Sequence, residues 1–126
     1  MSNAILEHVN VTVSDPDKTA AVLGRLFEWH VRWEGASKND GRTVHVGTES
    51  SYLALYTPPK MKNGSIASYL TSGGLNHIAV VVDNLDEIEE RVLTAGFKPY
   101  NQGNYDPGRR FYFLDHDEIE YEVVQY

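Results

Sequence analysis

The sequence predicts an α+β fold built from two βαβββ modules, and an internal repeat is the first observation behind this prediction. The segment Leu6–Val13 (LEHVNVTV) has a near-copy at Leu75–Val82 (LNHIAVVV), which places His8 and His77 at the same position of two strands 69 residues apart. An acidic helix start follows each copy, and three strand patterns follow each helix. A tandem array of short units needs about three copies or more to be stable, so two longer copies in 126 residues are expected to be halves of one domain.

The first module is expected to cover about residues 5–56. In Leu6–Val13 apolar and polar residues alternate, which is typical of a strand with one buried face. Asp15 and Pro16 form a helix start, and a helical spacing of apolar residues continues to Leu26. Three short strands, separated by turn-rich segments, are expected near His30–Glu34, Arg42–Val46 and Ser51–Tyr56.

The second module is expected to cover about residues 75–126, after a linker at 57–74 that carries prolines and glycines. Within the linker, the spacing of Ile66, Tyr69 and Leu70 predicts a short helix that packs on its own module. The composition of segment 102–108 predicts a mobile loop at the mouth of a site. The module repeats the order of the first, with a strand at Leu75–Val82, a helix from about Leu85 to Ala95, and strands near Lys98–Tyr100, Arg109–Leu114 and Glu120–Gln125.

The composition excludes several classes of protein. The chain has no cysteine, so neither a disulfide framework nor a thiolate zinc site can form. Its net charge of −7 provides no basic face for phosphate contacts, which argues against a nucleic-acid partner. No apolar run reaches the roughly 18 residues of a membrane span, and the N-terminus lacks the basic and apolar regions of a signal peptide. We therefore expect a soluble cytoplasmic protein without a membrane partner.

Three features together resemble the vicinal oxygen chelate superfamily, also called the glyoxalase, bleomycin-resistance and extradiol dioxygenase group. They are the paired βαβββ order, the motif His-x-x-x-x-Val that begins at His8 and at His77, and the segment Phe111–Asp117 (FYFLDHD) followed by Tyr121-Glu-Val123. The resemblance covers essentially the whole chain. It implies a single glyoxalase-like domain of residues 1–126, in which both modules form one cup-shaped mixed sheet around a divalent metal ion. It also implies a homodimer, because family members often complete the cup between subunits.

The resemblance carries three metal ligands over to this chain: His8, His77 and Glu122. The fourth ligand position of the family falls on Ala54, and alanine cannot bind a metal. Two imidazoles and one carboxylate suit Fe2+, Mn2+, Ni2+ or Zn2+, with coordination positions left open for substrate and water. The ordinary alternatives are that each strand histidine is a satisfied polar residue and that Glu122 is a solvated strand residue.

Alternation along the strands adds candidates for the polar wall of the cup. Tyr112 and His45 are candidate acids or bases beside the metal, since both side chains transfer protons readily near a cation. A structural role for Tyr112 is the alternative. Arg110 is a candidate for binding a substrate carboxylate or phosphate, or else an exposed strand residue. The other candidates for substrate binding are Asn10, Tyr52, Tyr56 and Tyr105.

The resulting hypothesis is a metal-dependent enzyme that acts on a small substrate with two adjacent oxygen atoms. Its reaction stays open. Isomerase or lyase chemistry of the glyoxalase type is weakened by Ala54, because the missing glutamate is ligand and base in that subgroup. Extradiol ring cleavage and fosfomycin-type thiol transfer use three ligands, but many extradiol enzymes are about twice this length, and the basic tail that binds the phosphonate in the fosfomycin group is missing. The alternative is a metal-free protein of the bleomycin-resistance type that sequesters a small molecule or drug. Eight tyrosines and two tryptophans suit stacking on a flat ligand, and the acidic charge attracts a cationic one.

Overall fold

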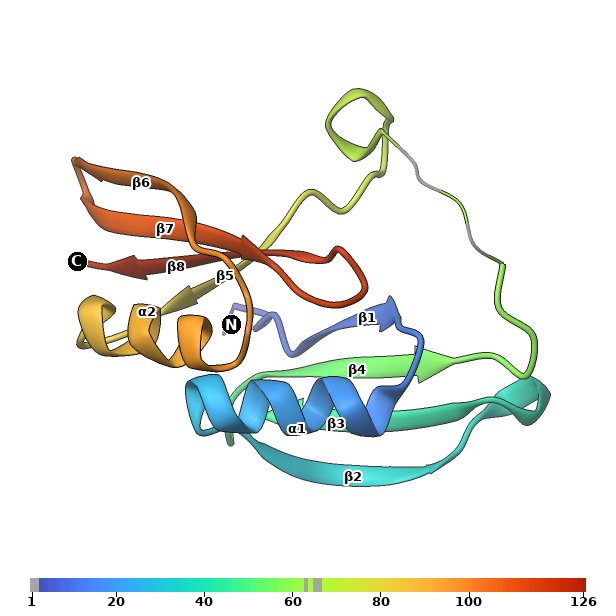
Figure 1. Ribbon diagram of the computed structural model, residues 1–126. Helices are drawn as coiled ribbons and strands as arrows, with labels where there is room; N and C mark the ends of the chain where they lie inside the picture. The colour runs from blue at the N-terminus through green and yellow to red at the C-terminus, as the bar shows by residue number, and fades with distance from the viewer. Residues whose placement is uncertain (1–2, 63, 65–66) are drawn as a thin grey trace. The chain divides into compact units, whose positions relative to one another are not determined.

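The computed structural model describes residues 3–62, 64 and 67–126 of the chain. The chain divides into two compact units, residues 1–62 and 63–126, which we call module one and module two. Within these residues, each module contains one α-helix and a four-stranded mixed sheet (Figure 1). The predicted α+β fold of two βαβββ modules is therefore confirmed.

Module one has the strand order β1-β4-β3-β2, with β1 parallel to β4 and the other pairs antiparallel. A parallel pair requires a crossover between β1 and the rest of the sheet, and α1 provides the start of it. A short 3-10 helix, η1 (Lys38–Asp40), links the second and third strands. The bounds are β1 (His8–Thr12), α1 (Pro16–Phe27), β2 (His30–Ala36), β3 (Arg42–Gly47) and β4 (Tyr52–Thr57).

Module two has the equivalent order β5-β8-β7-β6, again with the first strand parallel to the last and the other pairs antiparallel. The internal repeat seen in the sequence is thus a repeat of topology. A 3-10 helix, η2 (Ser68–Leu70), precedes the module's sheet. The bounds are β5 (Ile78–Val81), α2 (Leu85–Thr94), β6 (Tyr100–Tyr105), β7 (Gly108–Leu114) and β8 (Glu120–Gln125).

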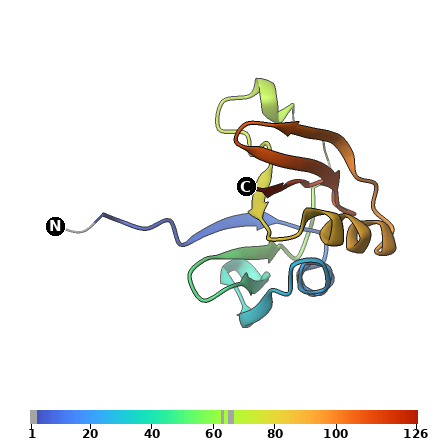
Figure 2. The ribbon, with the colours of Figure 1, turned by 90° about the vertical axis from the view of Figure 1, so that its left-hand side faces the viewer.

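The apolar face of each sheet packs under the helix of the same module. Figure 2 shows α1 end-on against the sheet of module one. Along β1, Val11 and Val13 are buried while His8 and Asn10 are exposed, so the predicted alternation is confirmed. The buried apolar residues of module one include Leu23, Leu26, Val44, Val46, Leu53 and Leu55, and those of module two include Ile88, Val92, Phe111, Phe113, Tyr121 and Val123.

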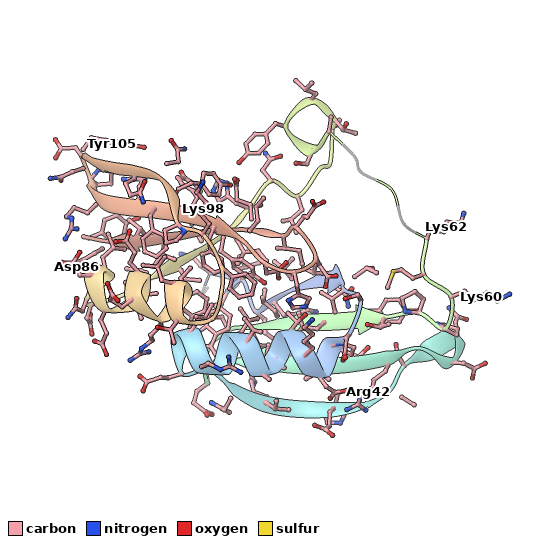
Figure 3. All side chains as sticks on the ribbon, viewed as in Figure 1. Arg42, Lys60, Lys62, Asp86, Lys98 and Tyr105 are labelled. Atoms are coloured by element: carbon pink, nitrogen blue, oxygen red, sulfur yellow. The ribbon has the colours of Figure 1, made fainter. Side chains whose placement is uncertain are left out.

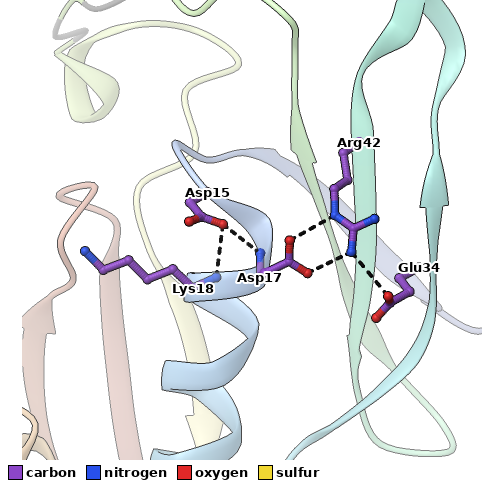
Figure 4. Close-up of polar contacts among 5 residues, drawn as sticks. All are labelled: Asp15, Asp17, Lys18, Glu34 and Arg42. Atoms are coloured by element: carbon purple, nitrogen blue, oxygen red, sulfur yellow. Dashed lines mark hydrogen bonds and ion pairs between the residues drawn. The ribbon is translucent and has the colours of Figure 1, made fainter.

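Polar contacts fix the start of α1 and fasten it to the sheet (Figure 4). The Asp15 carboxylate accepts hydrogen bonds from the backbone N–H of Asp17 (3.1 Å) and Lys18 (3.2 Å), which satisfies two of the free donors in the first turn. Arg42 on β3 donates to both oxygens of Asp17 at 2.9 and 2.8 Å and contacts Glu34 on β2 at 3.3 Å. Hydrogen bonding to Asp17 raises the pKa of Arg42.

Module two repeats this arrangement. Asn84 caps α2 by accepting from the backbone N–H of Glu87 at 3.2 Å, and Arg109 on β7 donates to Asp86 in the first turn of α2 at 2.9 Å. Asp86 lies at the beginning of α2 in Figure 3. Each helix therefore has a polar cap and an arginine contact from the third strand of its module. The sequence repeat extends to these residues.

Replacing Asp15 with alanine should destabilise the protein by about 1 kcal/mol, because the first turn of α1 loses its side-chain acceptor. Urea unfolding at neutral pH, followed by circular dichroism, measures the change. Asp15→Asn is the matched control, since asparagine caps helices as well as aspartate does. Equal stability of the alanine and asparagine variants would show that this cap does not contribute.

Several expectations about module two are wrong. The strand expected at Leu75–Val82 is only β5, so His77 immediately precedes it. The strand expected at Lys98–Tyr100 instead begins at Tyr100, and segment 102–108 belongs to the β6–β7 hairpin rather than to a loop. Glycine and asparagine lower strand propensity, but an edge strand tolerates them at a bulge, and the β6–β7 register shifts between Tyr100 and Gly103.

The apolar stripe expected in the linker is not buried against module two. Ile66 lies outside the described residues, while Tyr69 is 63% exposed and Leu70 is 89% exposed. Tyr69 nevertheless contacts the sheet of its own module, because its hydroxyl group donates to Glu120 on β8. None of the helices within residues 3–62, 64 and 67–126 is long and apolar enough to span a membrane.

Candidate functional site

In module one, three predicted site residues form a cluster of rings on the sheet face opposite α1. Tyr52 stacks on His8 with ring centroids 4.9 Å apart and on His45 with centroids 4.6 Å apart. The register explains this contact, because His8 pairs with Tyr52 across β1 and β4 while His45 lies on the neighbouring β3. Trp33 on β2 extends the cluster, with its ring 5.1 Å from that of His45.

Charged groups border these rings. Glu7 accepts from the Tyr52 hydroxyl at 3.1 Å and lies 2.9 Å from His8 Nδ1, and Arg32 lies over the Tyr52 ring at 4.4 Å. The hydrogen bond from His8 is the main cause that lowers the pKa of Glu7. Burial, followed by the positive charge that His8 can carry, lowers the pKa of His45, so His45 is neutral at physiological pH.

The other predicted residues of module one share this face but lie along β1 and β4. Asn10 pairs with Ala54, and Tyr56 pairs with Thr12 and Thr43. Ala54, the position of the family's fourth ligand, therefore has Asn10 on one side and His45 on the other. Neither neighbour places a carboxylate at this position.

In module two, Glu122 is the centre of a polar cluster on the sheet face opposite α2. It is only 9% exposed, and its Oε1 accepts a hydrogen bond from the Tyr112 hydroxyl at 3.0 Å and lies 3.7 Å from Arg110 Nη1. Burial, followed by the hydrogen bond to Glu122, raises the pKa of Tyr112. The phenol therefore keeps its proton at neutral pH. Both of these polar contacts use Oε1 of Glu122.

Arg110 links this cluster to the β6–β7 hairpin. Its guanidinium group lies 4.5 Å from the centroid of the Tyr105 ring, at the tip of the hairpin (Figure 3), and Nη2 donates to the backbone oxygen of Gly108 at 3.4 Å. Its Nε–H is buried and has no hydrogen-bond partner among the described residues. A planar donor that holds an unused N–H is suited to an additional anionic partner.

His77 lies next to a second carboxylate, Glu120. The Tyr69 hydroxyl donates to Glu120 Oε1 at 2.6 Å and lies 3.1 Å from His77 Nδ1, while His77 Nδ1 and Glu120 Oε1 are 3.8 Å apart. Tyr100 donates a short hydrogen bond to the other oxygen of Glu120. The hydrogen bond to Glu120 is the main cause that raises the pKa of Tyr69 to about 12. His77 and Glu120 also line a pocket of about 250 Å³.

His77 and Glu122 meet at Tyr112. The His77 ring lies edge-on to the Tyr112 ring at 5.7 Å, and the Tyr112 hydroxyl contacts Glu122. The structure thus groups the predicted residues of module two: His77, Tyr105, Arg110, Tyr112 and Glu122. Sequence reasoning assigned no role to Glu7, Tyr69, Tyr100 or Glu120. One signal was available for Glu120, because it lies at the repeat position of Tyr52, 68 residues later.

The donor set fits part of a divalent-metal site. Module two brings a half-buried imidazole and a buried carboxylate together at Tyr112, and the imidazole of His8 in module one is exposed. Within either module, the described residues do not bring three histidine, aspartate or glutamate side chains together. Nitrogen and carboxylate ligands of this kind suit first-row divalent ions.

The chain belongs to the glyoxalase/bleomycin resistance protein/dioxygenase superfamily, the vicinal oxygen chelate superfamily. The family model with this description matches residues 7–113, which is most of both modules. The resemblance inferred from the two histidine motifs is therefore confirmed. A comparison with curated proteins finds no match.

Solved structures share the fold over nearly the whole chain. A glyoxylase/bleomycin resistance protein/dioxygenase domain from Frankia sp. EAN1pec is 23% identical, with a TM-score of 0.83 and 98% of each chain covered. The fosfomycin resistance protein FosX from Mesorhizobium loti is 23% identical, with a TM-score of 0.70 over 98% of this chain and 92% of that chain. A FosX variant from Listeria monocytogenes, in complex with Mn(II) and 1S,2S-dihydroxypropylphosphonic acid, is 20% identical, with a TM-score of 0.73 over 98% and 93%.

Proposed function

We propose that this protein is a metal-dependent enzyme in which His8, His77 and Glu122 bind one divalent first-row metal ion. The observation that carries the proposal is the pairing of a half-buried imidazole with a buried carboxylate in module two, joined through Tyr112. His8 has the equivalent position in module one. The complex of the Listeria FosX variant with Mn(II) supports a divalent ion at this kind of fold.

The proposed substrate is a small molecule with two adjacent oxygen atoms. When bound, the ion supplies Lewis-acid stabilisation of negative charge on a substrate oxygen. The ligand of the Listeria FosX variant carries two neighbouring hydroxyl groups and an anionic phosphonate, which supports this class. Arg110, with its unused Nε–H, is the proposed anchor for an anionic group of the substrate.

Proton transfer is assigned to Tyr112 and His45, whose pKa values are shifted in opposite directions. Tyr112 keeps its proton because its pKa is raised, so it is the proposed proton donor. His45 is neutral because its pKa is lowered, so it is the proposed proton acceptor. Tyr52, Tyr56, Asn10 and Tyr105 are proposed to contact the substrate. The chemical structure of the substrate determines whether the reaction is a lyase or isomerase reaction or an oxygen-dependent ring cleavage.

Metal content measured by plasma mass spectrometry tests the proposal. The purified wild type, reconstituted with Fe2+, Mn2+, Ni2+ or Zn2+ and desalted, should retain roughly one ion per chain. His77→Ala should lose most of it, because two of three ligands hold a divalent ion weakly. His30→Ala is the control, since His30 lies on β2 and contacts only Glu49 among the charged groups described, at 3.2 Å.

Retention of the metal by His77→Ala would contradict the proposed ligand set. Failure of the wild type to retain any of the four ions would instead favour the second candidate, a metal-free small-molecule-binding protein. The stacked rings of His8, Tyr52, His45 and Trp33 are the observation behind that candidate. Such a row of rings suits a flat aromatic ligand.

A further inference from the structure

The polar contacts of the His77 imidazole with the described residues are made through Nδ1. Its Nδ1 contacts the Tyr69 hydroxyl at 3.1 Å, and that hydroxyl is also 2.6 Å from Glu120 Oε1. Two acceptor oxygens cannot approach to 2.6 Å without a proton between them, and the phenol supplies it. The single proton of Tyr69 is therefore used in the bond to Glu120. The proton in the contact between Tyr69 and His77 must come from the imidazole.

This proton count selects one tautomer of His77. With the proton on Nδ1, the neutral ring has its lone pair on Nε2, which is the form that binds a metal through Nε2. Glu120 is itself held from both sides, because Oε1 accepts from Tyr69 and Oε2 accepts from Tyr100. A carboxylate whose two oxygens both accept hydrogen bonds is suited to orienting a neighbour rather than to binding the metal itself.

Module one builds the same kind of support from different residues. Glu7 lies 2.9 Å from His8 Nδ1 and accepts from the Tyr52 hydroxyl at 3.1 Å, so a carboxylate and a phenol again meet beside Nδ1. In the sheet of module one, the residue paired with the histidine is Tyr52. In module two the corresponding position, one residue before the pair Ile78 and Tyr121, holds Glu120. In each module the other group comes from outside the sheet: the carboxylate of Glu7 in module one and the phenol of Tyr69 in module two.

We infer that Tyr69 and Glu120 are positioning residues that hold His77 with its proton on Nδ1 and its lone pair on Nε2, ready for a metal ligand bond. Glu7 and Tyr52 hold His8 in the same form. The use of these contacts for metal binding rests on the proposed function. The contacts themselves do not need a metal ion. The linker residue Tyr69 is thus assigned to the site, although its side chain is mostly exposed.

The tautomer can be measured without any metal or substrate. Long-range proton–nitrogen NMR spectra of the metal-free, nitrogen-15-labelled protein separate the two ring nitrogens, at a pH where the imidazole is neutral. Wild-type His77 should show the Nδ1–H form, whereas free neutral histidine in water favours Nε2–H. In Tyr69→Phe and in Glu120→Gln the Nε2–H form should gain population, because the acceptor chain on Nδ1 is broken.

Tyr126→Phe is the matched control. It makes the same chemical change at a tyrosine that is 75% exposed just after β8 and belongs to neither cluster, so the tautomer of His77 should not change. Wild-type His77 in the Nε2–H form, or an unchanged tautomer in Tyr69→Phe, would overturn the inference. Because Tyr69 is exposed, the variant should fold, and the wild-type spectrum alone already decides the tautomer.

Metal titration separates this inference from the proposed function. If the wild type binds a metal ion, Tyr69→Phe should weaken the affinity by roughly 10–100-fold, while Tyr126→Phe should change it little. Wild-type binding with an unaffected Tyr69→Phe variant would refute the positioning role and leave the metal site intact. An Nδ1–H tautomer that depends on Tyr69, in a protein that takes up no metal, would refute the proposed function and leave the positioning contacts intact.

Discussion

Phe113→Ala is expected to destabilise module two by about 3–5 kcal/mol, a large share of the total stability of a domain. Phe113 on β7 is completely buried, stacks on Tyr121 with ring centroids 5.0 Å apart, and lies 5.8 Å from the ring of Phe97. Removing the ring leaves a cavity that the surrounding rings cannot fill without leaving their own positions. Urea unfolding followed by tyrosine and tryptophan fluorescence measures the loss.

The adjacent residue provides the control for this experiment. Leu114 follows on the same strand but points to the other face and is 43% exposed, so Leu114→Ala should cost less than about 1 kcal/mol. Similar losses for both variants would mean that the substitution disturbs β7 itself rather than the core. A small loss for Phe113→Ala would show that the ring stack contributes little to folding.

Asp115→Ala is expected to cost about 2–4 kcal/mol, because one buried carboxyl group organises the turn between β7 and β8. Asp115 is 6% exposed; Oδ1 accepts from the backbone N–H of Asp117 at 2.8 Å and of Ile119 at 3.0 Å, and Oδ2 accepts from the Tyr121 hydroxyl at 3.1 Å. Alanine removes the side-chain acceptor of these three hydrogen bonds. Thermal unfolding at neutral pH, compared with Asp115→Asn, measures the effect, since asparagine keeps an acceptor oxygen in place.

The difference in stability between Asp115→Asn and the wild type should depend on pH. Burial outweighs the hydrogen bonds that Asp115 accepts and raises the pKa of its carboxyl group. The native state therefore keeps this proton to a higher pH than the unfolded chain, and the associated stability is present at low pH and lost as the pH rises through the native pKa. The stability of Asp115→Asn relative to wild type should thus increase between about pH 3 and pH 7. A constant difference would contradict the raised pKa.

Alternation predicted which residues share a face, because the side-chain period of a strand is fixed by its backbone. It placed His8 and Asn10 opposite Val11 and Val13, and the burial of these β1 residues agrees. It also placed Glu122 opposite Tyr121; both are buried, but Tyr121 stacks on Phe113 whereas Glu122 contacts Tyr112. The repeat predicted two modules of equal topology, because two similar patterns of alternation and capping select the same chain path. The metal-ligand roles of His8, His77 and Glu122 remain predictions.

The sequence did not reveal contacts that depend on side chains meeting across separate segments. Tyr69 reaches Glu120, 51 positions later, through one hydroxyl group, and no periodicity records such a contact. The β6–β7 hairpin was missed for a different reason. The glycine and asparagine residues of 102–104 match the composition of loops, while the hydrogen bonds that β7 offers to its edge partner decide the structure.

The contact of Arg110 with Glu122 decides whether module two would need the proposed metal ion in order to fold. A buried carboxylate without a counter-charge would strain module two until an ion arrived, as happens in small domains that unfold when their metal is removed. Here the guanidinium group of Arg110, 3.7 Å away, provides the counter-charge, and the Tyr112 phenol donates a hydrogen bond to the carboxylate. Module two is therefore expected to fold without a metal ion. If the proposed ion binds, a chelator should remove it while the helices and strands stay in place, and the metal-free protein should take the ion up again without refolding.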